Sequence, residues 1–195
     1  MATVIGSILH SRRRLAAAAL AFALMPRASV RAQASKPLDY TVKAVYLLNF
    51  GRFATWPPTT AAADAGSFGV CVLGHDPFGA TLDATVAAER IDGKTVVTRR
   101  IATPADATGC RILFVSNSEE RQLSVILQAA EKAGVLTVSD MPRFVERGGM
   151  IQFVAANNKV RFEINVGAAQ RAGLTLSSEL LRVAVSVRTA TKPDA

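Results

Sequence analysis

Residues 68–79 read FGVCVLGHDPFG, and this stretch decides the fold class. Its first six residues carry no charge, so we predict a short strand that is buried on both faces, as in a parallel sheet. Gly74 ends the strand, and Asp76-Pro77 has the pattern of a helix N-cap followed by proline in the first turn. Strand, turn and helix in this order are the opening unit of an α/β sheet.

A helix is predicted upstream, over residues 39–53, and Trp56-Pro57-Pro58 follows it. Its large apolar side chains recur at helical spacing and are expected to pack in the core, although a ligand-binding box would have the same pattern. These side chains are Val42, Val45, Tyr46, Phe50 and Phe53.

Three more apolar runs of strand length follow the opening unit. They are residues 95–101, 111–115 and 135–138. Asn117 and Glu120 have the spacing of a capping box, and the helix predicted from there ends at Gly134. Right-handed crossovers would place the strand at 111–115 beside the strand at 68–73.

The pattern changes in the C-terminal part of the chain. Residues 150–155 and 159–166 are strand-like and flank Asn157-Asn158, a favourable hairpin turn. In the second run polar residues alternate with apolar ones, as expected of an antiparallel edge strand with one buried face. The polar residues are Arg161, Glu163 and Asn165.

Two short helices are expected after the hairpin, one over residues 167–172 and one capped by Ser177 or Ser178. The tail from Val187 is expected to fray. The whole pattern predicts an α/β fold, a three-layer sandwich around a mostly parallel mixed sheet. The first strand is central in this sheet, and the antiparallel hairpin lies at its C-terminal end.

The N-terminal residues have the layout of a secretory signal peptide. Arg12-Arg13-Arg14 precedes the apolar run 15–25, and Ala32-Gln33-Ala34 supplies small residues for cleavage. The apolar run is shorter than the roughly 20 residues that span a bilayer, although an uncleaved anchor is the alternative. We therefore expect residues 1–34 to be removed and residues 35–195 to form a single exported domain.

Removal of residues 1–34 changes the charge of the chain. It takes away five arginines and no acid, so the formal net charge falls from +8 to +3. The remaining basic residues are interspersed with acids, and no nucleic-acid binding is predicted. No later segment is apolar over 18 residues, so no membrane insertion of the mature chain is expected.

Cys71 and Cys110 are the two cysteines of the chain, and export would put both in an oxidising compartment. An even count, without a CxxC motif or a histidine cluster, favours one disulfide over a metal site. Two buried free thiols are the alternative. No metal and no cofactor are predicted.

The sequence contains no GxSxG, Walker, HExxH or dinucleotide-binding motif, so no enzyme is predicted. The carboxyl ends of the parallel strands still offer a candidate ligand crevice, and a hydrolase that uses His75 with Asp76 or Asp140 is a further alternative. The crevice residues are Gly74, His75, Asp76, Ser139 and Asp140.

Six segments in order carry a resemblance to a known family. They read KAVYLLNFGRFATWP, FGVCVLGHDPFG, CRILFVS, VLTVSD, GGMIQFVAANNKVRFEIN and AGLTLSSELL. Together they resemble the YfiR-type periplasmic proteins (the DUF4154 family) over about residues 40–184. Arg111 departs from the family pattern, because many relatives have histidine at this position.

The resemblance implies a periplasmic protein that binds and inhibits the periplasmic sensor domain of a membrane-bound diguanylate cyclase. Such an inhibitor limits cyclic di-GMP signalling and biofilm formation. The resemblance also implies a homodimer and a disulfide whose reduction relieves the inhibition. A periplasmic small-molecule binding module is the alternative. The residues that we expect to contact the partner are Arg161, Glu163, Asn165, Leu174 and Leu176.

Overall fold

The computed structural model describes residues 36–58 and 66–189, so the predicted signal peptide lies outside the described residues. The helices are α1 (Lys36–Phe53), α2 (Ala80–Val86), α3 (Leu123–Ala133), α4 (Val166–Arg171) and α5 (Ser178–Val183), with 3₁₀ helices η1 (Pro104–Ala107) and η2 (Asn117–Gln122). The strands are β1 (Ala54–Thr55), β2 (Ser67–Leu73), β3 (Arg90–Ile91), β4 (Lys94–Ile101), β5 (Cys110–Val115), β6 (Leu136–Ser139), β7 (Ile151–Ala156), β8 (Lys159–Asn165), β9 (Thr175–Leu176) and β10 (Ser186–Arg188).

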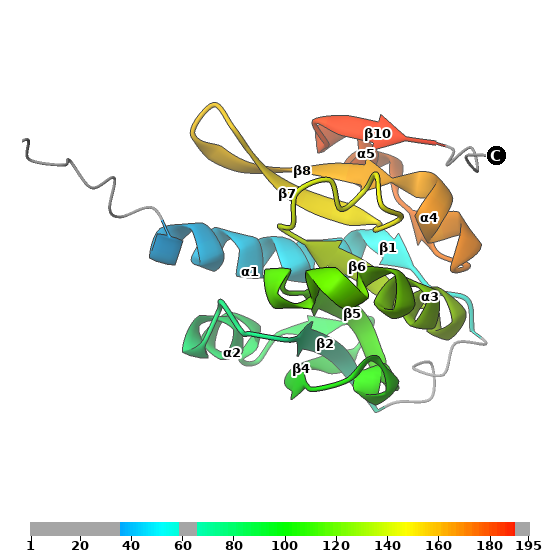
Figure 1. Cartoon of the computed structure of the whole chain (residues 1–195). Coiled ribbons are helices and arrows are strands. Elements are labelled where there is room, and N and C mark those ends of the chain that lie inside the picture. The colour runs from blue at the N-terminus through cyan, green and yellow to red at the C-terminus, as the bar shows by residue number, and fades with distance from the viewer. Residues whose placement is uncertain (1–35, 59–65, 190–195) are drawn as a thin grey trace, which may run out of the picture. The chain divides into compact units, whose positions relative to one another are not determined.

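Most of these strands join one sheet in the order β10-β8-β7-β6-β5-β2-β4-β3 (Figure 1). β2 lies between β4 and β5 and runs parallel to both, which confirms the predicted contact between the strands at 68–73 and 111–115. β6 and β7 continue the parallel array, whereas β8 returns antiparallel to β7. The predicted mostly parallel mixed sheet is therefore confirmed. β1 and β9 form a separate antiparallel pair.

Helices cover both faces of the main sheet and make the predicted three layers. On one face, α1, α2, α4 and α5 pack over an apolar cluster that includes Phe50, Phe114 and Phe162. On the other face, α3 packs over a second cluster that includes Cys71 and Leu113. Because side chains alternate along a strand, β2 and β5 contribute to both clusters, and this explains why their sequences are apolar at almost every position.

α1 confirms the predicted helix and the predicted burial of Phe50, but three of the five side chains predicted in the core are exposed. Ala44 and Phe50 are fully buried, whereas Val42, Val45 and Phe53 expose 37%, 47% and 40% of their surface. The prediction that these last three side chains pack in the core is wrong. α1 carries apolar residues on nearly every side, so periodicity alone does not select the buried face.

The predicted starts of α2 and α3 are also wrong. The Asp76 carboxylate accepts a hydrogen bond from the amide of Phe78 at 2.8 Å, which closes a turn, and α2 begins only at Ala80. The segment after β5 forms η2 before α3, and its N-cap is Ser116 rather than Asn117. Asp and Asn side chains stabilise turns as readily as helix starts, so their spacing did not distinguish the two.

The β7–β8 hairpin is confirmed, with Asn157 and Asn158 at φ 51° and 57°, as a type I′ turn requires. β8 is not the edge strand, however, because β10 pairs with it in parallel (Figure 1). The predicted fraying from Val187 is therefore wrong for Val187 and Arg188, which lie in β10. The outermost strand at this end of the sheet is β10.

Candidate functional site

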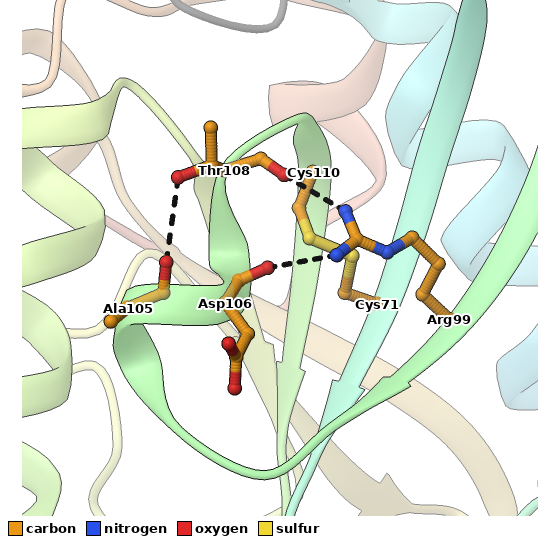
Figure 2. The surroundings of a disulfide bond; sticks show 6 residues. All are labelled: Cys71, Arg99, Ala105, Asp106, Thr108 and Cys110. Carbon is orange, nitrogen blue, oxygen red and sulfur yellow. Dashed lines mark hydrogen bonds between the residues drawn. A yellow bond between two sulfur atoms is a disulfide. The ribbon is translucent and has the colours of Figure 1, made fainter.

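A disulfide joins Cys71 on β2 to Cys110 at the start of β5, as predicted (Figure 2). The two Cα atoms are 5.9 Å apart, within the range that a disulfide spans. Gly69 is the strand partner of Cys110, and Cys71 is two residues further on, so the two cysteines face the same side of the sheet. Both are buried in the apolar cluster under α3.

The two halves of the predicted crevice meet at the carboxyl edge of the sheet. Gly74–Asp76 follows β2, and Ser139–Asp140 lies at the end of β6, with β5 between these strands. η2 bridges the two halves: the hydroxyl of Ser118 accepts a hydrogen bond from the amide of His75 at 3.0 Å, and Asn117 Nδ2 donates to Asp140 at 2.9 Å. The side chain of Ser118 also lies against Gly74. Ligand binding at this edge stays a prediction.

Asp140 joins α1 to this edge of the sheet. Its Oδ2 accepts hydrogen bonds from the hydroxyl of Tyr40 at 2.7 Å and from Lys43 Nζ at 2.9 Å. The Lys43 side chain is 9% exposed, contacts Asp39 at 3.2 Å and lies 4.2 Å from the centroid of the Tyr40 ring. Burial raises the pKa of Tyr40, and Asp140 and Asp39 raise it further, so the hydroxyl stays protonated and donates.

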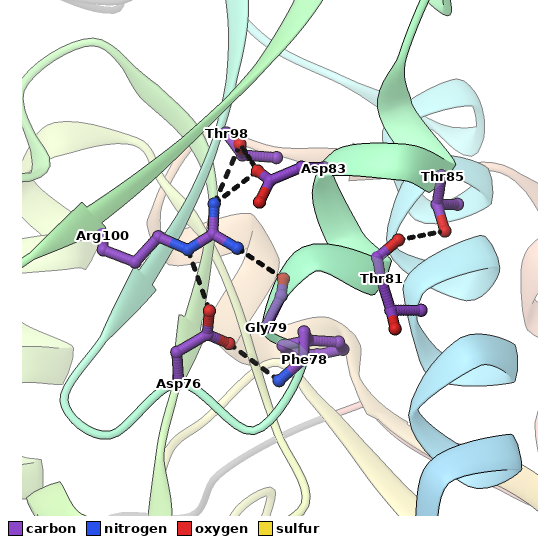
Figure 3. A network of polar contacts seen from close by, with 8 residues as sticks. All are labelled: Asp76, Phe78, Gly79, Thr81, Asp83, Thr85, Thr98 and Arg100. Atoms are coloured by element: carbon purple, nitrogen blue, oxygen red, sulfur yellow. Dashed lines mark hydrogen bonds and ion pairs between the residues drawn. The ribbon is translucent and has the colours of Figure 1, made fainter.

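Asp76 belongs to a second polar network, centred on Arg100 of β4 (Figure 3). Arg100 Nε donates to Asp76 Oδ2 and Nη2 to the carbonyl of Gly79, both at 2.8 Å. Nη1 pairs with Asp83 of α2, which also accepts from the hydroxyl of Thr98. The hydrogen bonds from Arg100 and then Thr98 lower the pKa of Asp83. This network ties the β2–α2 loop to β4.

The residues of the alternative hydrolase site have other partners within the described part of the chain. His75 is exposed, and the two carboxylates considered for it bind Arg100 and Lys43. Ser139 is fully buried, and its hydroxyl donates to the carbonyl of Val115 at 2.7 Å. Over residues 36–58 and 66–189, no three His, Cys, Asp or Glu side chains are grouped so that they could hold a metal ion.

Three of the residues expected to contact a partner lie in the interior. Asn165 is 2% exposed; its Nδ2 donates to the carbonyl of Val145 and its Oδ1 accepts from the amide of Ala168, both at 2.9 Å. It is the N-cap of α4. Leu174 and Leu176 expose 1% and 8% of their surface and belong to the core under α1. The prediction that Asn165, Leu174 and Leu176 lie on the contact surface is therefore wrong, because all three are buried.

The outer end of the sheet presents a surface that the sequence reasoning missed. Arg161 and Glu163 are half-buried on β8, and the Arg161 guanidinium donates to the carbonyl of Val183 at 3.1 Å. Val183, Val185 and Val187 expose 54%, 50% and 38% of their surface. Val183 is the last residue of α5, Val185 precedes β10 and Val187 lies within β10, the strand at which the sequence predicted a fraying tail. We call these five residues the C-terminal edge.

Among the residues that the structure describes, no helix has both the length and the apolar character needed to cross a membrane. Comparison with curated proteins gave no match. A crystal structure of a conserved domain protein from Vibrio cholerae O1 biovar El Tor is 15% identical, with a TM-score of 0.50. The ABC domain from Streptococcus pneumoniae, solved in complex with L-Trp, is 13% identical, with a TM-score of 0.51. Each match covers 76% of this chain and 60% of the other, and shows similarity of fold alone.

The family comparison covers most of the chain. The family model DUF4154, described as YfiR/HmsC-like, matches residues 40–185. Proteins of this family are periplasmic and regulatory rather than catalytic. The matched range begins within α1 and ends between α5 and β10, so it includes the disulfide and the polar contacts of Asp140 and Arg100. This chain belongs to the YfiR/HmsC-like family.

Proposed function

We propose that this protein binds and inhibits the periplasmic sensor domain of an inner-membrane diguanylate cyclase, and so limits cyclic di-GMP signalling and biofilm formation. The observation that carries the proposal is the family match over residues 40–185. An inhibitor must bind the inactive state of its partner more tightly than the active state. A rigid scaffold favours such discrimination because little binding free energy is lost in ordering it. The disulfide and the covered sheet are consistent with that requirement.

The same proposal includes the export of the protein and its oligomeric state. Residues 1–34 act as the signal peptide, and residues 35–195 form the mature domain with its core at about residues 40–184. The mature protein is a homodimer without cofactor or turnover of its own. The Asp76 and Asp140 carboxylates support this last point, because each is paired with a cation.

The C-terminal edge is the proposed contact surface for the cyclase. Arg161 and Glu163 supply charge, and three exposed valines supply apolar area. β10 is the outermost strand of the sheet, so its backbone is available for pairing with an extended segment of the partner. Arg161 and Glu163 were predicted from the sequence and are kept in this surface, whereas the three valines are added because the structure exposes them.

Gene deletion tests the proposal. Loss of the protein should raise cyclic di-GMP and surface attachment, because the cyclase would lose its inhibitor. The full chain should restore the low level, whereas residues 35–195 without the leader should not. An unchanged cyclic di-GMP level after deletion, in cells that contain the cognate cyclase, would contradict the inhibitor function.

The partner itself can be identified from membranes. Tagged mature protein should retain a membrane protein with a periplasmic sensor domain and a cytoplasmic cyclase domain. Recovery of soluble periplasmic proteins alone, with no cyclase among them, would argue for a different regulatory target.

A further inference from the structure

Arg99 lies directly beside the buried disulfide. β2 and β4 are parallel, and Arg99 is the strand partner of Cys71. Partnered residues of neighbouring strands project to the same face of a sheet, so the Arg99 side chain runs along the face that carries both cysteines. Figure 2 shows its guanidinium next to the disulfide, between β4 and the loop that leads into β5.

The guanidinium binds that loop through two carbonyl groups. Nη1 donates to the carbonyl of Thr108 at 2.8 Å, and Nη2 donates to the carbonyl of Asp106 at 3.1 Å. We call residues 102–109 the cover loop; it contains η1 and ends next to Cys110. Hydrogen bonds from a charged donor are stronger than neutral ones, and these two bonds link β4 to the cover loop.

The cover loop is also part of the apolar layer around the disulfide. Ala107 is 4% exposed and belongs to the same cluster as Cys71 and Cys110. Inside the loop, the Asp106 carboxylate accepts hydrogen bonds from the amide and the hydroxyl of Thr103, at 3.0 and 2.8 Å. The turn of the cover loop is therefore held by hydrogen bonds within the loop, which do not involve β4.

Reduction of a disulfide requires a thiolate to reach one of its sulfur atoms. Cys71 and Cys110 are 0% and 1% exposed, so a reductant cannot reach them in the closed structure. Exchange must follow an opening of the structure, either local or global. Arg99 itself is exposed and binds the loop at the surface, so its two hydrogen bonds can break without unfolding of the sheet.

We propose that Arg99 and the cover loop control access of dithiol reductants to the Cys71–Cys110 disulfide. One thiolate of the dithiol attacks a cysteine sulfur, a mixed disulfide forms, and the other cysteine leaves as a thiolate. The second thiolate of the reductant then attacks the mixed disulfide and releases the remaining cysteine. The reductant leaves as a cyclic disulfide, and two electrons pass to the protein.

The test measures the rate at which excess dithiothreitol reduces the oxidised mature protein, by acid quench, alkylation and mass spectrometry. Arg99→Met removes both hydrogen bonds but keeps an aliphatic side chain of similar length. It should raise the rate about tenfold, because loss of about 1.4 kcal/mol from the opening equilibrium is a factor of ten. A rate within twofold of wild type would overturn the proposal.

Arg100→Met is the matched control. Arg100 is the next residue on β4, and its guanidinium binds Asp76, Gly79 and Asp83 instead of the cover loop (Figure 3). Arg100→Met removes the same charge as Arg99→Met, but it should leave the reduction rate within twofold of wild type. An equal increase in both variants would mean that general destabilisation, not the cover loop, controls access.

Two further measurements keep the result decisive. Low urea should leave the reduction rate of Arg99→Met nearly constant, because local opening exposes little surface; a steep increase would indicate global unfolding and contradict the proposal. In unfolding concentrations of urea, all variants should react at one rate.

If Arg99→Met does not fold, Asp106→Ala removes the internal turn of the cover loop and should also accelerate reduction. An unchanged reduction rate in Asp106→Ala would overturn the proposal.

Discussion

The hydroxyl of Tyr40 donates a 2.7 Å hydrogen bond to the carboxylate of Asp140, 100 residues further along the chain. Lys43 binds the same carboxylate oxygen one helical turn after Tyr40, so two side chains of α1 converge on one acid at the end of β6. These contacts tie the N-terminal half of α1 to the sheet, in addition to the packing of α1 residues such as Phe50 in the core.

Asp140→Asn should lower the free energy of unfolding by about 2–3 kcal/mol, measured by urea denaturation. Removal of one partner leaves the other charge in a site where both side chains are about one-tenth exposed. The contact between Lys43 and Asp39 remains, so the loss stays below that of a fully orphaned ion. Arg171→Ala breaks a pair with Glu131 in which both side chains are over 40% exposed, and should cost less than about 1 kcal/mol. Equal costs for the two variants would contradict this account.

Cys71→Ser should lower the melting temperature by several degrees, because a native disulfide typically contributes about 2–4 kcal/mol. The bond links positions 39 residues apart and so restricts the unfolded chain. Calorimetry of the oxidised wild type and the variant measures the shift. Thiol counting on the unfolded, unreduced wild type is the control and should find no free thiol.

Asp83 should make the protein less stable in acid. The pKa of Asp83 in the folded protein lies below the usual value. The contribution of the ionised Asp83 to the free energy of unfolding is therefore complete above its pKa in the unfolded chain, and it is lost as the pH falls through its pKa in the folded protein. The difference in unfolding free energy between wild type and Asp83→Asn should therefore shrink below about pH 4. Urea denaturation at a series of pH values measures this difference. A difference that is constant down to about pH 2 would show that Asp83 does not titrate with folding.

Val185→Glu should weaken binding to the cyclase sensor domain at least about tenfold, because a charge on the C-terminal edge must be desolvated in the complex. Val185 is half exposed, so the variant should fold with near wild-type stability. Val125→Glu is the matched control, since Val125 is 62% exposed but lies on α3, over the opposite face of the sheet. An equal loss of binding in both variants would contradict the proposal that the C-terminal edge is the contact surface.

The sequence determined the parallel sheet and the disulfide. The uncharged run of β2 and the apolar run that follows Arg111 in β5 are typical of strands that are buried on both faces, and burial on both faces requires other elements to cover both sides of the sheet. Asn157 and Asn158 specified the hairpin, since few residues adopt positive φ in a two-residue turn. Cys71 and Cys110 are the two cysteines of the chain, so a disulfide within the chain could join only these two. In each case a short segment carries its own physical constraint.

Tertiary structure alone decided which face of α1 is buried, that β10 pairs with β8, and that Asn165, Leu174 and Leu176 lie in the interior. α1 carries apolar residues on nearly every side, and its hydrogen bonds to Asp140 together with the packing of Phe50 in the core leave Val42 and Val45 exposed. Arg99 and Arg100 are neighbours of the same type, yet one binds the cover loop and the other binds Asp76. The alternation of a strand sends them to opposite faces, and the elements they meet there are brought close only when the sheet is assembled.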